Sequence, residues 1–87
     1  MKLVKCYHII IIEQEVPHDL WEHEYNGIKY ESFVEAQKIL EEQAMRVPGV
    51  CNAWIETYGI DEDENEHDVS YEWQIGKLED WIYELYK

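Results

Sequence analysis

The chain has 87 residues, of which 46% are apolar and 14% aromatic, and its 20 acids and 7 bases give a formal net charge of −13. A chain of this length has surface enough for only one core, so we expect a single domain over residues 1–87, and the composition excludes a disordered chain. The charge disfavours direct contact with nucleic acid or an anionic membrane and predicts attraction to basic surfaces.

No signal peptide or membrane-spanning segment is predicted. The apolar run Ile9–Ile12 is too short for either, and acids follow it from Glu13 onward. We therefore expect a cytoplasmic protein in which Cys6 and Cys51 are reduced, buried and behave as small hydrophobic residues. A disulfide between them is an open alternative if they lie on adjacent strands.

Residues 3–15, LVKCYHIIIIEQE, are rich in β-branched and aromatic side chains, which predicts a strand that ends before Pro17. The four consecutive Ile indicate a central strand that is covered on both faces. Further along, Asn26-Gly27 is typical of a type I′ turn and favours a short hairpin between LWEHEY and IKY. A helical turn over Asp19–Glu24 is the alternative.

Residues 32–47, SFVEAQKILEEQAMRV, have the pattern of a helix. Ser32 and Glu35 form a capping box at its start, and Pro48-Gly49 ends it. The apolar residues that share one stripe at helical spacing are Phe33, Ala36, Leu40, Ala44 and Val47.

Two more strands are predicted over residues 50–60 and 69–75, followed by an amphipathic helix over residues 77–87. The order of elements is β(ββ)αββα, and the first and second long strands could pair in parallel through a right-handed crossover. We expect an α+β fold, with a three- to five-stranded sheet and two helices on one face, close to a truncated ferredoxin-like layout.

Six acids occupy the eight positions from Asp61 to Asp68. The simplest interpretation is a solvated hairpin tip. An EF-hand calcium loop is an alternative, because Asp61, Asp63, Asn65 and Glu72 match its ligand spacing, but Glu66 stands where the loop needs Gly. A partner-binding surface is the third interpretation.

Charge spacing limits how far that surface could imitate DNA. Alternate residues on a strand are roughly 6.7 Å apart, about half the charge density of a phosphate strand. Imitation of a duplex would therefore need a second acidic edge, an acidic helix or a second copy.

Other chemistry has little support in the sequence. His18, Glu22 and His23 are close in sequence, and Cys6 and His8 share a strand face, but no spacing typical of a zinc site is present. Nothing resembles a nucleophile motif or a phosphate-binding loop, so we expect neither an enzyme nor a cofactor.

The stretch NGIKYESFVEAQKILEE, residues 26–42, resembles a pattern found in small phage and mobile-element proteins. Together with the small size and acidity, it implies a resemblance to phage-encoded inhibitors of host defence, such as anti-restriction and anti-CRISPR proteins that mimic DNA. Those proteins share acidity and no sequence motif, so the resemblance assigns no role to any residue of this chain.

We therefore expect a small non-enzymatic binding protein that occupies a basic surface of a nucleic-acid-handling protein. The candidate partner-binding residues are the acids of the run and of the last helix with two aromatic anchors: Asp61, Glu62, Asp63, Glu64, Glu66, Asp68, Glu79, Asp80, Glu84, Trp21 and Tyr86. The alternatives are a structural or assembly protein that self-associates, for example as a homodimer, and a calcium- or zinc-binding domain.

Overall fold

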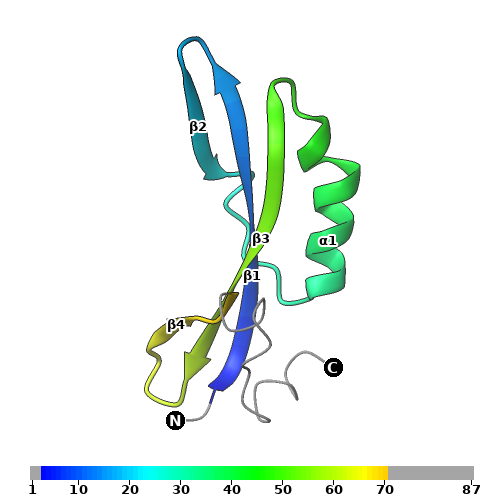
Figure 1. Ribbon diagram of the computed structural model, residues 1–87. Coiled ribbons are helices and arrows are strands. Elements are labelled where there is room, and N and C mark those ends of the chain that lie inside the picture. The colour runs from blue at the N-terminus through cyan, green and yellow to red at the C-terminus, as the bar shows by residue number, and fades with distance from the viewer. Residues whose placement is uncertain (1–2, 71–87) are drawn as a thin grey trace.

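The computed structural model describes residues 3–70, which form a four-stranded antiparallel sheet with one α-helix on one face (Figure 1). The strands are β1 (Leu3–Val16), β2 (Asp19–Glu24), β3 (Val50–Asp61) and β4 (Glu66–Asp68), and their order in the sheet is β2-β1-β3-β4. The helix α1 spans Phe33–Glu42, and a short 3₁₀ helix follows it at Ala44–Arg46.

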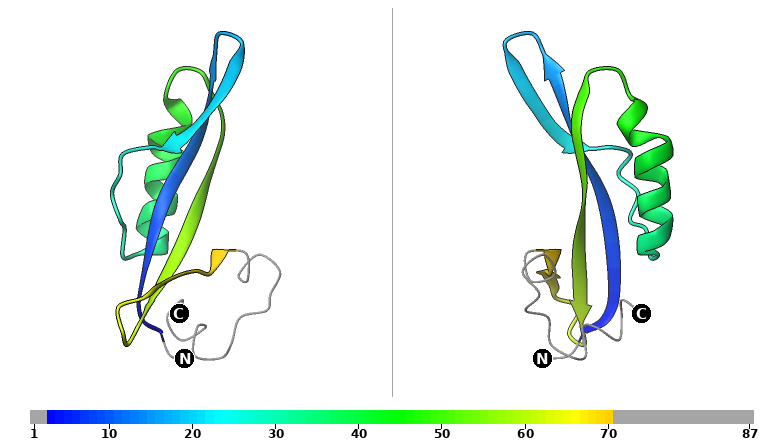
Figure 2. Two further views of the ribbon diagram at one scale, coloured as in Figure 1. Left: turned by 90° about the vertical axis from the view of Figure 1, so that its left-hand side faces the viewer. Right: turned by 45° about the vertical axis from the view of Figure 1, so that its right-hand side comes forward.

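The predicted ferredoxin-like layout with two helices on one face is wrong. The described residues form a strand-rich, curled half-barrel with one short helix, and β1 pairs with β3 in antiparallel orientation (Figure 2). The chain reverses three times, in the β1–β2 hairpin, in the loop before α1 and at the turn after the 3₁₀ helix, and β3 therefore enters the sheet opposite to β1. The predicted helix over 77–87, and the predicted strand over 69–75 beyond Ser70, lie outside the described residues.

The first hairpin is also placed differently from the prediction. Val16 lies opposite Asp19, so its two-residue turn is Pro17-His18. Pro fixes its own φ near −65°, and His18 has a φ of 74°, which is the combination of a type II turn. Gly or Asn normally occupies the second position, so the sequence gives little sign of this turn. The helical alternative over residues 19–24 is wrong, because they form β2.

Asn26-Gly27 instead redirects the chain from β2 toward α1. Gly27 has a φ of 70°, and the Asn26 side chain accepts a hydrogen bond from the Ile28 N–H at 3.0 Å. Tyr30 then pairs with His8 on β1 through two backbone hydrogen bonds of 2.7 and 2.9 Å. This loop therefore brings the start of α1 beside the middle of β1.

The predicted helix start is confirmed, because the Ser32 hydroxyl accepts a hydrogen bond from the Glu35 N–H at 3.2 Å. The helix ends at Glu42, earlier than predicted, and the 3₁₀ helix replaces its last turn. Ala36 and Ala44 are both fully buried, and these small side chains let the helical segment approach the sheet closely.

Strand β1 is covered on both faces, as its run of Ile predicts. Ile10 and Ile12 pack under α1 in a core with Tyr30, while Ile9 and Ile11 pack on the opposite face of the sheet. Side chains alternate along a strand, so a continuous apolar run needs partners on both sides. The second face is completed by Tyr7, Trp54, Tyr58 and Ile60.

The two cysteines lie on adjacent strands but at opposite ends of them. Cys6 is opposite Gly59, whereas Cys51 lies beside Glu13, and both thiols are free. Cys51 is exposed, against the prediction, and Cys6 is half-buried, which raises the pKa of its thiol. Among residues 3–70, no helix reaches the length and apolarity that crossing a bilayer requires.

Candidate protein-binding surfaces

The acidic run forms the β3–β4 hairpin, so its prediction as a hairpin is confirmed. The returning strand lies inside the run itself, with Glu66 opposite Ile60 and Asp68 opposite Tyr58. The turn between the strands is organised by Asp61, whose residue surface is only 6% exposed. Asp61 therefore belongs to the frame of the hairpin and not to its binding surface.

Both carboxylate oxygens of Asp61 are hydrogen-bonded within the turn. Oδ1 accepts the N–H groups of Asp63 and Asn65 at 2.8 and 2.9 Å, and Oδ2 lies 2.8 Å from Nε2 of His67. The bond to His67, followed by the backbone bond from Asn65, lowers the pKa of Asp61 to about 2. The first ligand of the suggested calcium loop is thus already used by the protein, and Glu72 lies outside the described residues.

The other acids of the run divide into two groups. The Tyr7 hydroxyl donates a hydrogen bond to Glu66, and the Ser70 N–H donates one to Asp68 at 3.0 Å. The tip residues Glu62–Glu64 are exposed, and within residues 3–70 no base forms an ion pair with them. The tip is therefore the part of the run whose charge is available to a partner.

Trp21 does not join this surface. It lies on the β1–β2 hairpin, at the opposite end of the sheet from β4 (Figure 1). Its side chain and that of Leu20 are each 53% exposed, and its indole stacks on the His23 ring with 3.8 Å between centroids. The remaining candidates, Glu79, Asp80, Glu84 and Tyr86, lie outside the described residues.

The hairpin that carries Trp21 has acids of its own, which were not among the candidates predicted from the sequence. Asp19, Glu22 and Glu24 lie on the same exposed strand, and Glu13 and Glu15 lie on the neighbouring part of β1. The sequence does show acids alternating with other residues in EQE and in DLWEHE. These two segments lie side by side, however, only because the chain turns at Pro17-His18. The molecule thus has two acidic hairpins, one at each end of the sheet.

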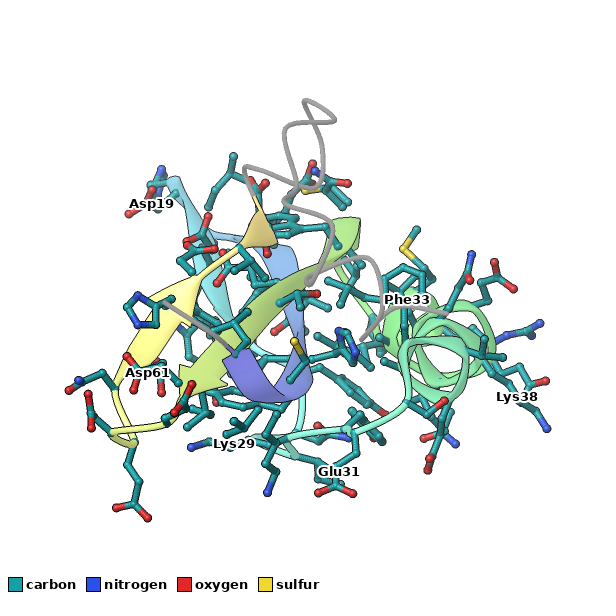
Figure 3. The ribbon with its side chains drawn as sticks, turned by 90° about the horizontal axis from the view of Figure 1, so that it is seen from below. Asp19, Lys29, Glu31, Phe33, Lys38 and Asp61 are labelled. Carbon is teal, nitrogen blue, oxygen red and sulfur yellow. The ribbon has the colours of Figure 1, made fainter. Side chains whose placement is uncertain are left out.

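No Lys or Arg of the described segment forms an ion pair with an acid of either hairpin. Lys5 forms an ion pair with Glu31 at 3.3 Å, and the Lys29 ammonium lies 4.8 Å from the centre of the Tyr7 ring. Seen from below, Asp19 and Asp61 lie on the side of the sheet away from α1, which carries Lys38 (Figure 3). Among residues 3–70, the acids of the two hairpins are therefore not neutralised by ion pairs with Lys or Arg.

The histidines do not gather into a metal site in the part of the chain that the structure describes, where no three metal-ligating side chains are arranged to hold an ion. His23 and Glu22 are consecutive on β2 and point to opposite faces. His8 and Cys6 do share a face of β1, but His8 is buried and its Nδ1 lies 2.8 Å from the Thr57 hydroxyl. Burial lowers the pKa of His8.

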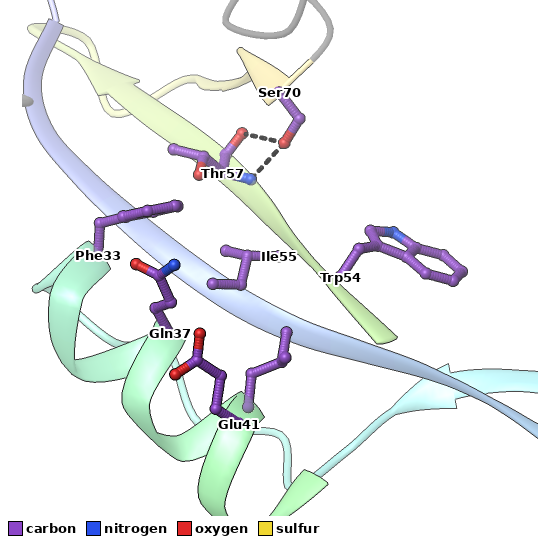
Figure 4. A pocket seen from close by; sticks show the side chains of 8 residues that line it. Phe33, Gln37, Glu41, Trp54, Ile55, Thr57 and Ser70 are labelled. Carbon is purple, nitrogen blue, oxygen red and sulfur yellow. Dashed lines mark hydrogen bonds between the residues drawn. The ribbon is translucent and has the colours of Figure 1, made fainter. Parts of the chain in front are cut away.

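A groove of about 290 Å³ lies between α1 and β3. Phe33 and Trp54 stand at its two ends, and the side chains of Gln37 and Glu41 extend from α1 toward Ile55 on β3 (Figure 4). Its other lining residues are Leu40, Thr57 and Ser70. On the side of the groove away from α1, the Ser70 hydroxyl hydrogen-bonds to the backbone of Thr57, which ties the residues that follow β4 to β3.

No protein-family model, curated protein or solved structure matches this chain. Any functional assignment therefore depends on the geometry and charge of the two acidic hairpins and of the groove.

Proposed function

We propose that this protein is a small non-enzymatic binding protein that occupies a basic, nucleic-acid-binding surface of another protein, such as a CRISPR or restriction component. The observation that supports the proposal is the unneutralised charge of the two hairpins. Residues 3–70 contain 16 acids and 4 bases, and a single Lys–Glu ion pair lies among them. Exposed charge of one sign speeds encounter with a surface of the opposite sign and orients it.

The spacing of the two hairpins is compatible with a surface that binds DNA. Strand β3 has 12 residues and joins the two ends of the sheet. At about 3.3 Å per residue it spans roughly 40 Å. One turn of B-DNA advances about 34–36 Å, so two acidic ends at this separation resemble phosphates on one face of a duplex.

Self-association through the open edge of β2 is the alternative, and the charge of that edge opposes it. Two copies of Asp19–Glu24 paired side by side would bring like charges together along the new ladder, which is destabilising. Light scattering over a range of concentrations separates the two proposals. A concentration-dependent dimer would favour self-association.

The test compares three variants that each remove three negative charges. They neutralise the first hairpin (Asp19→Asn, Glu22→Gln, Glu24→Gln), the second hairpin tip (Glu62→Gln, Asp63→Asn, Glu64→Gln) and, as a control, dispersed acids at and near α1 (Glu31→Gln, Glu35→Gln, Glu42→Gln). Each protein is immobilised, incubated with cell extract, and eluted with a salt gradient or with duplex DNA.

Partners should be released by salt and displaced by DNA, because both compete for the same charges. Either hairpin variant should release them at lower salt than the control. The proposal would be contradicted if neither salt nor duplex DNA released the partner. It would also be contradicted if the control variant weakened binding as much as the hairpin variants do.

A further inference from the structure

We propose that the groove between α1 and β3 binds an arginine side chain of the basic partner. The inference rests on the proposed function for the source of that side chain, but the chemistry of the groove can be tested without the partner. Arginine is enriched among the few residues that carry most of the binding energy at protein interfaces, where it inserts into desolvated pockets.

The walls of the groove suit the apolar stem of an arginine. Phe33, Leu40 and Ile55 provide apolar contacts for three methylene groups. Trp54 borders one end of the groove, while its ring packs with Ile11 on the opposite face of the sheet, where the indole N–H donates a hydrogen bond to Glu56 at 3.3 Å.

The polar lining accepts hydrogen bonds from a cation. The Glu41 carboxylate and the Gln37 amide extend from α1 into the groove, and neither has a hydrogen bond or ion pair to the other described residues (Figure 4). No Lys or Arg of residues 3–70 lines the groove. A guanidinium offers five donors in a plane and forms its strongest hydrogen bonds with carboxylates.

The size and charge of the groove disfavour other occupants. A volume of about 290 Å³ is at the lower end of small-molecule sites, which suits one long side chain better than a cofactor. A carboxylate or phosphate would be repelled by Glu41. A wholly apolar side chain would remove water from Glu41 and Gln37 without replacing their hydrogen bonds.

The test uses two probes that differ in charge and hardly at all in shape. N-acetyl-arginine amide and its neutral counterpart N-acetyl-citrulline amide are titrated into the isotope-labelled protein, and the NMR signals of the Gln37 side chain and of the Ile55 and Thr57 amides are followed. The arginine probe should shift these signals and bind about tenfold more tightly than citrulline, because its bonds to Glu41 are charge-assisted.

Two variants on the same helix locate the effect. Glu41→Gln should weaken binding of the arginine probe about tenfold, whereas Glu42→Gln, which removes the same charge one position outside the groove, should change it less than about twofold. Both acids are exposed, so both variants should fold. Equal binding of the two probes, equal effects of the two variants, or shifts confined to the acidic hairpins would overturn the inference.

The two proposals fail separately. If the arginine probe binds in the groove while no partner is retained in a salt- and DNA-sensitive way, the arginine site is supported and the proposed function is contradicted. If such a partner is retained while the probe leaves the NMR signals of the groove unchanged, the arginine site is contradicted and the proposed binding role of the acidic hairpins is still supported.

Discussion

Glu13 on β1 and Glu22 on β2 lie directly opposite each other in the first hairpin. Residues opposite each other on antiparallel strands project to the same face, and like charges in that position destabilise the pair of strands. Glu13 has one polar contact, at 3.4 Å from the Asn52 side-chain amide, whereas Glu22 is exposed and has no ion pair within the described segment. The hairpin thus keeps two opposed carboxylates at some cost to its stability.

Neutralising Glu22 should therefore stabilise the protein. Glu22→Gln is expected to raise the free energy of unfolding by about 0.2–1 kcal/mol at low salt, because it removes the repulsion from Glu13. Glu24→Gln is the matched control, since Glu24 lies opposite the apolar Ile11. Urea denaturation at low and high salt measures both. A Glu22→Gln variant no more stable than Glu24→Gln would contradict the argument.

The low pKa of Asp61 predicts how the second hairpin responds to acid. A carboxylate with a pKa of about 2 in the folded state and about 3.9 when unfolded stabilises the fold above about pH 4. That contribution is lost as the pH falls from about 4 toward 2. Asp61→Asn should be less stable than the wild type at pH 7 and should lose less stability over the acid range.

Denaturation curves between pH 2 and 7 measure this difference. Asp63→Asn serves as the control, because the Asp63 side chain makes no hydrogen bond to the other described residues. If Asp63→Asn and Asp61→Asn had the same pH profile, the frame that we assign to Asp61 would be wrong.

Tyr58 predicts a loss of stability in alkali. Burial and a 2.9 Å hydrogen bond from its hydroxyl to Glu56 raise the pKa of Tyr58 to about 12. The neutral phenol therefore stabilises the folded state fully below the unfolded pKa of about 10, and this contribution disappears as the pH rises through about 12. Tyr58→Phe should reduce the pH dependence of unfolding over that range. In a pH titration of the folded protein, part of the phenolate absorbance should appear only at a pH well above that of an ordinary tyrosine. If no such part is seen, the hydrogen bond to Glu56 is not supported.

Gly59 provides a test of packing at the start of β1. A Cβ built at this position would lie 2.3 Å from Cδ1 of Leu3, which is itself buried. Gly59→Ala should lower the free energy of unfolding by about 1–3 kcal/mol, because the side chain of Leu3 must move. In Leu3→Ala the space opens, so adding Gly59→Ala to that variant should cost markedly less. Additive effects in thermal or urea denaturation would show that the two residues do not meet.

The turn of the first hairpin predicts a stabilising substitution. His18 has a φ of 74°, a region that favours Gly and costs about 1–2 kcal/mol for other residues. His18→Gly should raise the free energy of unfolding by about 0.5–1 kcal/mol after the greater freedom of unfolded Gly is counted. His18→Ala retains the side-chain strain and should give no gain. Equal stability of the two variants would show that the backbone of His18 is not strained in this turn.

Much of the local structure could be predicted from the sequence. The apolar run from Ile9 to Ile12 predicts a strand buried on both faces, and Ser32 predicts the start of α1, because both signals act over a few neighbouring residues. The acidic run predicts a hairpin for the same reason. The turn at Pro17-His18 was not predicted, because His18 has a positive φ, and Gly or Asn normally occupies such a position.

The candidate site was predicted less well, because it depends on which distant segments meet. The sequence shows that acids are abundant, but Asp61 faces inward as a hydrogen-bond acceptor and Trp21 lies at the far end of the sheet. The groove brings Glu41 on α1 within reach of Ile55 on β3 only after the helix has packed.

By itself, then, the sequence determined the two long strands β1 and β3, the helix cap and the excess of negative charge, because periodicity and capping are properties of adjacent residues. The tertiary structure alone decided that β3 runs antiparallel to β1, that two acidic hairpins occupy opposite ends of one sheet, and that a groove opens beside α1. These features follow from the number of chain reversals and from contacts across β1 and β3, and no local pattern encodes them.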